Sequence, residues 1–182
     1  MERLFIIIRK ITISRKHYVV FRSYIYLNKY SNVVGGFVIS EVYLIERSGK
    51  LIYHNAFRSF FEDERNVPPV KKDLHLISGA IVALAEFAET VYNRRLNQLK
   101  FEDKMMHVAT LDRVVVCIVT DGPVISALFL ANKYGNILNK KLESFGRVVE
   151  VMKVLDYLRE DIEALEGEIK ELNDLIKQTT YI

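Results

Sequence analysis

The stretch EVYLIERSGKLIYHN, residues 41–55, decides the fold because it predicts a β-hairpin. Two runs rich in Val, Ile, Leu and Tyr, which favour strands, flank Arg47-Ser48-Gly49-Lys50. Small, turn-forming residues between two such runs indicate a tight turn. An isolated hairpin is marginally stable in water, so the elements that follow it must supply the rest of a core.

A long helix is predicted after the hairpin. Pro68-Pro69 interrupts a polar connection, and Asp73 follows as a candidate N-cap. Beyond it, apolar residues at spacings of three and four predict a helix of about five to six turns, and the stripe comprises Leu74, Ile77, Ile81, Leu84, Ala88 and Val91. Four small residues on this helix would allow it to approach a sheet closely, namely Ala80, Ala83, Ala85 and Ala88.

Three further strands and a second helix are predicted next. QLKFED and MMHVATLD form a candidate pair with a turn at Asp103-Lys104, and a second turn at Asp112-Arg113 leads into VVVCIVTD. Because this last run is apolar at nearly every position, it predicts a central strand that is buried on both faces. Asp121-Gly122-Pro123 ends the strand and opens a helix that Gly146 ends.

The predicted order is β-β-α-β-β-β-α, followed by one more helix. We expect an α+β fold in which a five-stranded antiparallel sheet carries helices on both faces, with a long C-terminal coiled-coil helix. The run from ISEVYLIERSGKLIYHN through VVVCIVTDGP resembles the longin or SNARE-like domains, which are profilin-like folds of trafficking proteins and their prokaryotic or archaeal relatives. The resemblance covers residues 38–145. It implies a non-enzymatic interaction module, commonly one that binds small GTPases, and transfers no individual binding residue.

A heptad pattern dominates the end of the chain. Nine apolar residues alternate spacings of three and four: Val148, Val151, Leu155, Leu158, Ile162, Leu165, Ile169, Leu172 and Ile176. With Val148 at position a, Ile at a and Leu at d favour a parallel two-stranded coiled coil. We predict that these residues form the seam of a homodimer or of a hetero-coiled coil. The less favoured alternative is a helix that folds back onto its own sheet.

The charges beside this seam do not fit a parallel homodimer. Asp161 at position g would face Glu166 at position e of the partner, which places like charges together. Val154 and Leu175 widen the apolar stripe beyond a narrow seam. These features favour a basic partner helix, an antiparallel pair or packing against a domain.

Composition indicates a globular protein, with 50% hydrophobic and 27% charged residues. Cys117 is the single cysteine, which excludes an intrachain disulfide. We therefore expect a cytoplasmic location, with attachment at the periphery of a membrane as a further option. No run of about 18 uncharged apolar residues occurs, so we predict no transmembrane segment.

The charge is unevenly distributed along the chain. Residues 1–36 hold seven Lys/Arg and one acid, a net of +6, whereas residues 148–178 hold four Lys/Arg and nine acids, a net of −5. The predicted regions are therefore a basic segment 1–36, a longin-like domain 37–147 and a coiled-coil helix 148–178. The basic segment is interpreted as an extra strand, a basic arm, or an untranslated region before a functional start near Val38. We expect no nucleic-acid partner for the domain itself.

The sequence lacks common nucleotide-binding and catalytic motifs. It contains no P-loop, dinucleotide-binding, HExxH or GxSxG pattern. His17, His54, His75 and His107 share no metal-ligand spacing, and Cys117 lies in an apolar run where a thiol behaves as a small hydrophobe. We therefore expect no enzyme, no cofactor and no metal site.

Two functions are compatible with the domain and its terminal helix, and a third, a basic nucleic-acid or membrane binder, would depend entirely on residues 1–36. The leading hypothesis is an adaptor whose longin-like domain binds a protein partner, with a small GTPase as the candidate, and whose heptad helix mediates assembly. The alternative is a PAS-like sensor that binds a small ligand and signals through its C-terminal helix. A sensor predicts a closed apolar pocket of about 300 Å³ or more.

Overall fold

The structure is a computed structural model that describes residues 38–57, 73–101, 104–122, 124–145 and 150–180. All of these residues belong to one compact unit, Gly35–Ile182. Residues 1–36, interpreted above as an extra strand, a basic arm or an untranslated region, lie outside the described residues, as does the Pro68-Pro69 connection.

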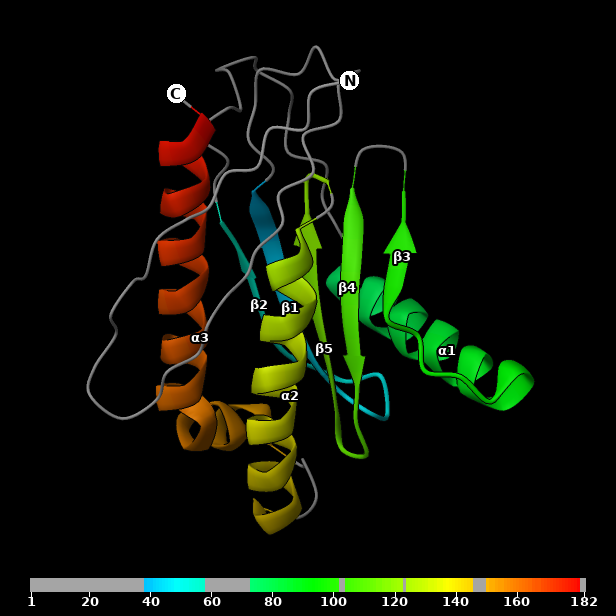
Figure 1. The fold of residues 1–182 in the computed structure, drawn as a ribbon. Helices are drawn as coiled ribbons and strands as arrows, with labels where there is room; N and C mark the ends of the chain where they lie inside the picture. The colour runs from blue at the N-terminus through cyan, green and yellow to red at the C-terminus, as the bar shows by residue number, and fades with distance from the viewer. Residues whose placement is uncertain (1–37, 58–72, 102–103, 123, 146–149, 181–182) are drawn as a thin grey trace. The chain divides into compact units, whose positions relative to one another are not determined.

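The elements of the described residues follow one another in the predicted order (Figure 1). They are β1 (Ile39–Glu46), β2 (Leu51–Ala56), α1 (Leu74–Tyr92), β3 (Gln98–Lys100), β4 (Met105–Thr110), β5 (Val114–Thr120), α2 (Ile125–Phe145) and α3 (Val151–Thr180). Asp73 caps α1 as predicted, because its side chain accepts hydrogen bonds from the backbone N–H groups of His75 and Leu76.

The strands form one antiparallel sheet in the order β2-β1-β5-β4-β3. Figure 1 shows α2 and α3 on one face of this sheet and α1 on the other. The predicted α+β class, with a five-stranded antiparallel sheet and helices on both faces, is confirmed.

Strand β5 occupies the centre of the sheet and is buried along its whole length. Its residues alternate between two hydrophobic cores, with Val116 and Ile118 facing α2 and α3, and Val115 and Cys117 facing α1. The prediction of a doubly buried central strand is therefore confirmed, and the two cores explain why its sequence shows no polar alternation.

Helix α2 lies close to the sheet because Gly135 carries no side chain. A Cβ atom at this position would lie 2.7 Å from Leu111 Cδ1 and 3.5 Å from Ala109 Cβ. The helix runs through Gly135 without interruption from Ile125 to Phe145. Close packing offsets the low helix propensity of glycine, which costs about 1 kcal/mol relative to alanine.

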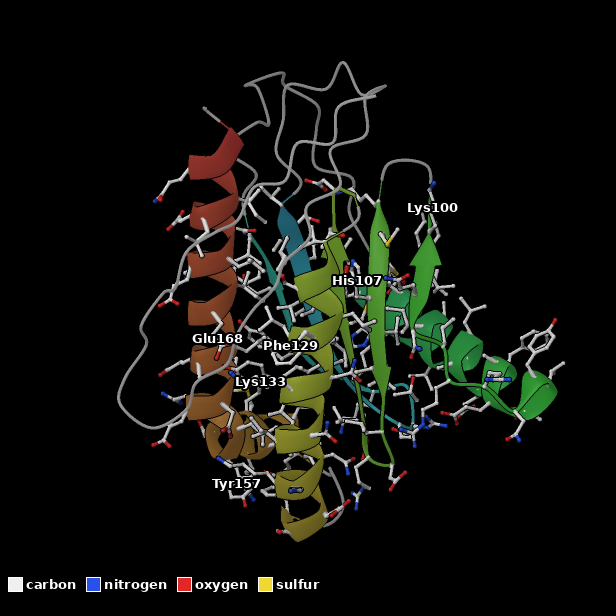
Figure 2. All side chains as sticks on the ribbon, viewed as in Figure 1. Lys100, His107, Phe129, Lys133, Tyr157 and Glu168 are labelled. Atoms are coloured by element: carbon white, nitrogen blue, oxygen red, sulfur yellow. The ribbon has the colours of Figure 1, made fainter. Side chains whose placement is uncertain are left out.

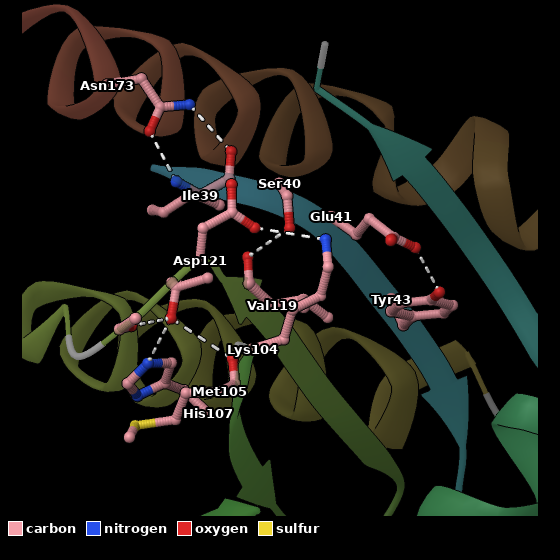
Figure 3. A network of polar contacts seen from close by, with 12 residues as sticks. Ile39, Ser40, Glu41, Tyr43, Lys104, Met105, His107, Val119, Asp121 and Asn173 are labelled. Carbon is pink, nitrogen blue, oxygen red and sulfur yellow. Dashed lines mark hydrogen bonds and ion pairs between the residues drawn. The ribbon is translucent and has the colours of Figure 1, made fainter. Parts of the chain in front are cut away.

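Asn173 of α3 fastens the helix to the first residue of β1 (Figure 3). Among the described residues, the ladder between β1 and β2 ends where the N–H of Phe57 donates to Ser40 O at 2.8 Å. Beyond it, Asn173 Oδ1 accepts from the N–H of Ile39 at 2.8 Å, and Asn173 Nδ2 donates to Ile39 O at 3.0 Å. The buried amide thus replaces the missing strand partner.

We predict that Asn173→Ala lowers the free energy of unfolding by roughly 2–4 kcal/mol, because it leaves a backbone N–H and a C=O buried without partners. Urea denaturation of the full chain measures the change. The control is Asn136→Ala, which removes an exposed amide on α2 that bonds Asn132 O and is expected to stay within about 0.5 kcal/mol. Equal effects of the two substitutions would contradict the assigned role of Asn173.

Candidate functional site

The residues of the predicted coiled-coil seam lie in the core of their own chain. Leu158, Ile162, Leu165 and Ile169 are buried in the cluster shared with the sheet and α2. The outer seam positions pack against that cluster while partly buried, namely Leu155, Leu172 and Ile176. Val151 is half-buried, and Val148 lies outside the described residues.

The sequence favoured an intermolecular coiled coil over a helix folded back onto its own sheet, and this packing reverses that preference. Within the chain, α3 adopts the fold-back arrangement, because the sheet and α2 offer its apolar stripe a partner that needs no second chain. Pairing of α3 with another helix stays a prediction, and it would require the buried seam residues to leave this core.

Carboxylates on α3 fix its position along the sheet and α2. Three of them reach other elements, with Asp161 paired to Lys141, Glu166 accepting from Tyr53 and Asn55, and Glu168 paired to Lys133 and accepting from Tyr134. Figure 2 shows Glu168 and Lys133 facing each other between the two helices. Burial, together with the bonded carboxylates, raises the pKa values of Tyr53 and Tyr134 above the usual value for tyrosine.

Helix α1 contacts the sheet through a small set of residues. Its buried residues are Ser78, Ile81, Val82 and Ala85. The predicted stripe was wrong at Leu84 and Val91, which are 44% and 56% exposed. Ala80 and Ala83, predicted to lie against the sheet, are exposed as well. The helix is rotated relative to the prediction, so its sheet-facing side is centred on smaller residues.

Polar contacts also hold α1 against the β1–β2 turn. Ser78 is fully buried, and its hydroxyl shares its one proton between Gly49 O of the turn and His75 O of α1 itself, each at 3.0 Å. Arg47 in the same turn pairs with Glu89 at 2.5 Å and with Glu86 at 3.9 Å. The ends of α1 are thus tied to the hairpin with which the fold begins.

The outer face of α1 is a second apolar surface, directed away from the sheet. We use this name for six exposed residues: Leu76, Ala80, Ala83, Leu84, Phe87 and Val91. Leu76 and Phe87 are 71% and 54% exposed, although both are large apolar side chains. Residues 76, 80, 83 and 87 follow helical spacing, so they line up along one side of α1. Contiguous exposed apolar surfaces are typical of interaction sites.

Among the described helices, α1 also has the length and apolar composition that a membrane span requires. The sequence predicted no such span. Two apolar faces on one helix account for this composition, and one of the two packs on the sheet through Ile81 and Ala85. Because Ser78 and Arg47 fasten that side, we treat the opposite side as an interaction surface.

A buried polar cluster lies on the α1 face of the sheet, and Figure 3 shows its contact between Tyr43 and Glu41. Tyr43 Oη donates to Glu41 at 2.5 Å, and His54 Nε2 lies 3.3 Å from the same carboxylate. Burial raises the pKa of the Cys117 thiol to about 12, so it is protonated and unreactive at neutral pH. Within the described residues, no group of three or more His, Cys, Asp or Glu side chains is placed to hold a metal ion.

Comparison with known proteins gives distant structural neighbours. No family model matches the chain, and no curated protein matches it in sequence. The gliding protein MglB from Thermus thermophilus is similar with 15% identity and a TM-score of 0.39, over 52% of this chain and 70% of that one. Myxococcus xanthus MglB has 16% identity and a TM-score of 0.40, over 58% and 85%. MglB with a tetrameric arrangement has 14% identity and a TM-score of 0.42, over 56% and 76%.

The remaining titratable group in the core is His107 of β4, which is fully buried. Its Nδ1 lies 3.3 Å from Gln98 Nε2, an N–H donor, and its Nε2 lies 3.1 Å from Thr120 Oγ1. The ring is therefore neutral with its proton on Nε2, since a second proton on Nδ1 would face the Gln98 donor. Burial lowers the pKa of His107 below its usual value.

We predict that stability falls as the pH drops below about 6.5, the pKa of histidine in an unfolded chain. Below that pH, the unfolded state binds a proton that folded His107 does not accept. Urea midpoints at about pH 7.5 and about pH 5.5 should differ less in His107→Gln than in the parent chain. His75→Gln, at an exposed position near the start of α1, is the control and should retain the parental difference. A parental difference in His107→Gln would refute the assignment.

Proposed function

We propose that this chain is a non-enzymatic adaptor that self-associates through the outer face of α1 and binds a further protein partner. The observation that carries this proposal is the second apolar face of α1, where Leu76, Phe87 and Val91 are more than half exposed. Burial of apolar surface contributes about 25 cal/mol per Å², so association that covers these side chains is favourable.

A second copy of the chain fits this face. In an antiparallel pair centred between Ala83 and Leu84, Ala80 lies opposite Phe87 of the other copy, and Leu76 lies opposite Val91. Each large side chain near the centre thus meets a small one, and the same residues serve both copies, as two-fold symmetry requires. Ala80, Ala83 and the exposed Gly79 also allow two helices to approach closely.

We predict that light scattering of the full chain shows a dimer, and that Phe87→Glu converts it to a monomer. The substitution places a charge in the apolar contact but leaves the sheet-facing side of α1 untouched. The matched control is Met152→Glu, an equally apolar-to-acidic change at a residue of α3 that is 70% exposed. It should remain dimeric.

A size exchange tests the register of this dimer. Ala80→Phe alone should weaken association, because two large side chains would then face each other at positions 80 and 87. Ala80→Phe combined with Phe87→Ala should restore it. A parent chain that stays monomeric at high concentration, or a dimer that Phe87→Glu leaves intact, would overturn the proposal.

The proposed class of partner is a small GTPase, in keeping with the resemblance to longin domains. We predict that the immobilised full chain retains a GTP-binding protein in a manner that differs between GDP and a non-hydrolysable GTP analogue. The retained protein would then be purified and its affinity for the chain measured with each nucleotide. Equal affinity in the two states, or retention of proteins that bind no nucleotide, would reject this class of partner.

Assembly through α3 and a cytoplasmic location stay predictions from the sequence. The PAS-like sensor is the weaker candidate, because it predicted a closed apolar pocket. A cavity formed by described residues is lined largely by charged and polar side chains and opens to solvent at one end of the sheet.

A further inference from the structure

This cavity lies on the α1 side of the sheet, apart from the outer face of α1. It has a volume of about 460 Å³ and forms where the end of α1 meets the β1–β2 and β4–β5 turns. Its lining residues are Arg47, Glu89, Asn93, Arg94, Arg95, Thr110, Leu111 and Asp112. A cavity of this size lies within the range of small-molecule sites.

The charges in the cavity are partly neutralised. Arg47 is paired with Glu89 at 2.5 Å, which removes one cation and one anion. Arg94 and Arg95 make no ion pair with any described residue, and both are exposed. Asp112 is the remaining carboxylate. The cavity therefore offers two unpaired guanidinium groups and one carboxylate to a ligand.

Thr110 supplies an independent indication of a ligand. The residue is 4% exposed, and its buried hydroxyl has no hydrogen-bond partner. Leaving such a group without a partner costs about 1–3 kcal/mol. A rotation of the Thr110 side chain that turns its hydroxyl into the cavity would let a ligand oxygen accept from it and remove this cost, whereas the described part of the chain provides no acceptor there.

We propose that this cavity binds a small organic phosphate. Guanidinium groups match the geometry of phosphate oxygens and bind them in pairs, so Arg94 and Arg95 are suited to hold a phosphoryl group. Its third oxygen accepts from Thr110. Asp112 accepts hydrogen bonds from hydroxyl groups on the uncharged part of the ligand, and the Asn93 side chain donates or accepts beside it.

The fold of a single chain positions the cavity residues, so the site does not require an assembly. Asn93 ends α1 in a left-handed conformation with φ of 50°, and its N–H and that of Arg94 both bond Ala88 O. This turn sets the direction in which Arg94 and Arg95 leave the helix. The proposal therefore does not depend on self-association through the outer face of α1.

Calorimetric titration of the full chain tests the proposal, with glycerol 3-phosphate, inorganic phosphate and glycerol as probes. We expect saturable binding of glycerol 3-phosphate, weaker binding of inorganic phosphate and none of glycerol. Replacing both Arg94 and Arg95 by Ala should weaken glycerol 3-phosphate binding at least about tenfold, because both charge-assisted contacts are lost. Arg159→Ala, on α3 and paired with Asp156, is the control for charge and should bind as the parent does.

Thr110→Val separates binding from folding. It removes the hydroxyl but keeps the shape, so the urea midpoint of the ligand-free protein should stay unchanged or rise, while affinity falls about fivefold. Asp112→Asn should reduce the preference for glycerol 3-phosphate over inorganic phosphate. The proposal is overturned if neither phosphate binds at moderate ionic strength, or if the arginine and threonine substitutions leave binding unchanged.

Discussion

Burial of β5 on both faces is the constraint on which the rest of the structure depends. A strand with Val115 and Cys117 on one side and Val116 and Ile118 on the other needs cover on both. Helix α1 covers one face, and α2 approaches the other closely at Gly135. The β2–β1 side of that second face still requires apolar cover, and α3 supplies it from the end of the chain. The fold-back of α3 thus follows from the same requirement that places β5 at the centre.

The heptad pattern shows what periodicity can and cannot establish. Spacings of three and four predicted the helix and its apolar side, and the structure confirms both at Leu158, Leu165 and Ile169. They do not identify the surface against which this apolar side packs, because either a sheet or a second helix can bury it. The signal that distinguishes the two was the charge pattern. Asp161 and Glu166, which would repel each other in a parallel homodimer, bond instead to Lys141 and to Tyr53 and Asn55 of the same chain.

The order of elements, the turns and the cap at Asp73 were predictable because each depends on neighbouring residues. The rotation of α1 about its own axis was not predictable in this way. Its sequence is apolar on two sides, so a stripe through Leu84 and Val91 was as regular as the one that the sheet buries. The cavity was beyond the reach of sequence analysis for a different reason. Arg47, Arg94 and Thr110 come from three separate segments, which the sheet order and the packing of α1 against the β1–β2 turn bring together.

Helix α1 buries less apolar surface against the sheet than α2 and α3 do, and this explains why both proposed binding surfaces involve it. Its sheet-facing side is narrow and includes Ser78 and Ala85, whereas α2 and α3 bury Leu138, Leu142 and Leu165 completely or nearly so. A helix with little buried apolar surface contributes less to folding and keeps more of its side chains for binding. The ion pair between Arg47 and Glu89 links its last turns to the first hairpin, at the edge of the cavity. A ligand there would strengthen the attachment of the same helix that presents the outer face.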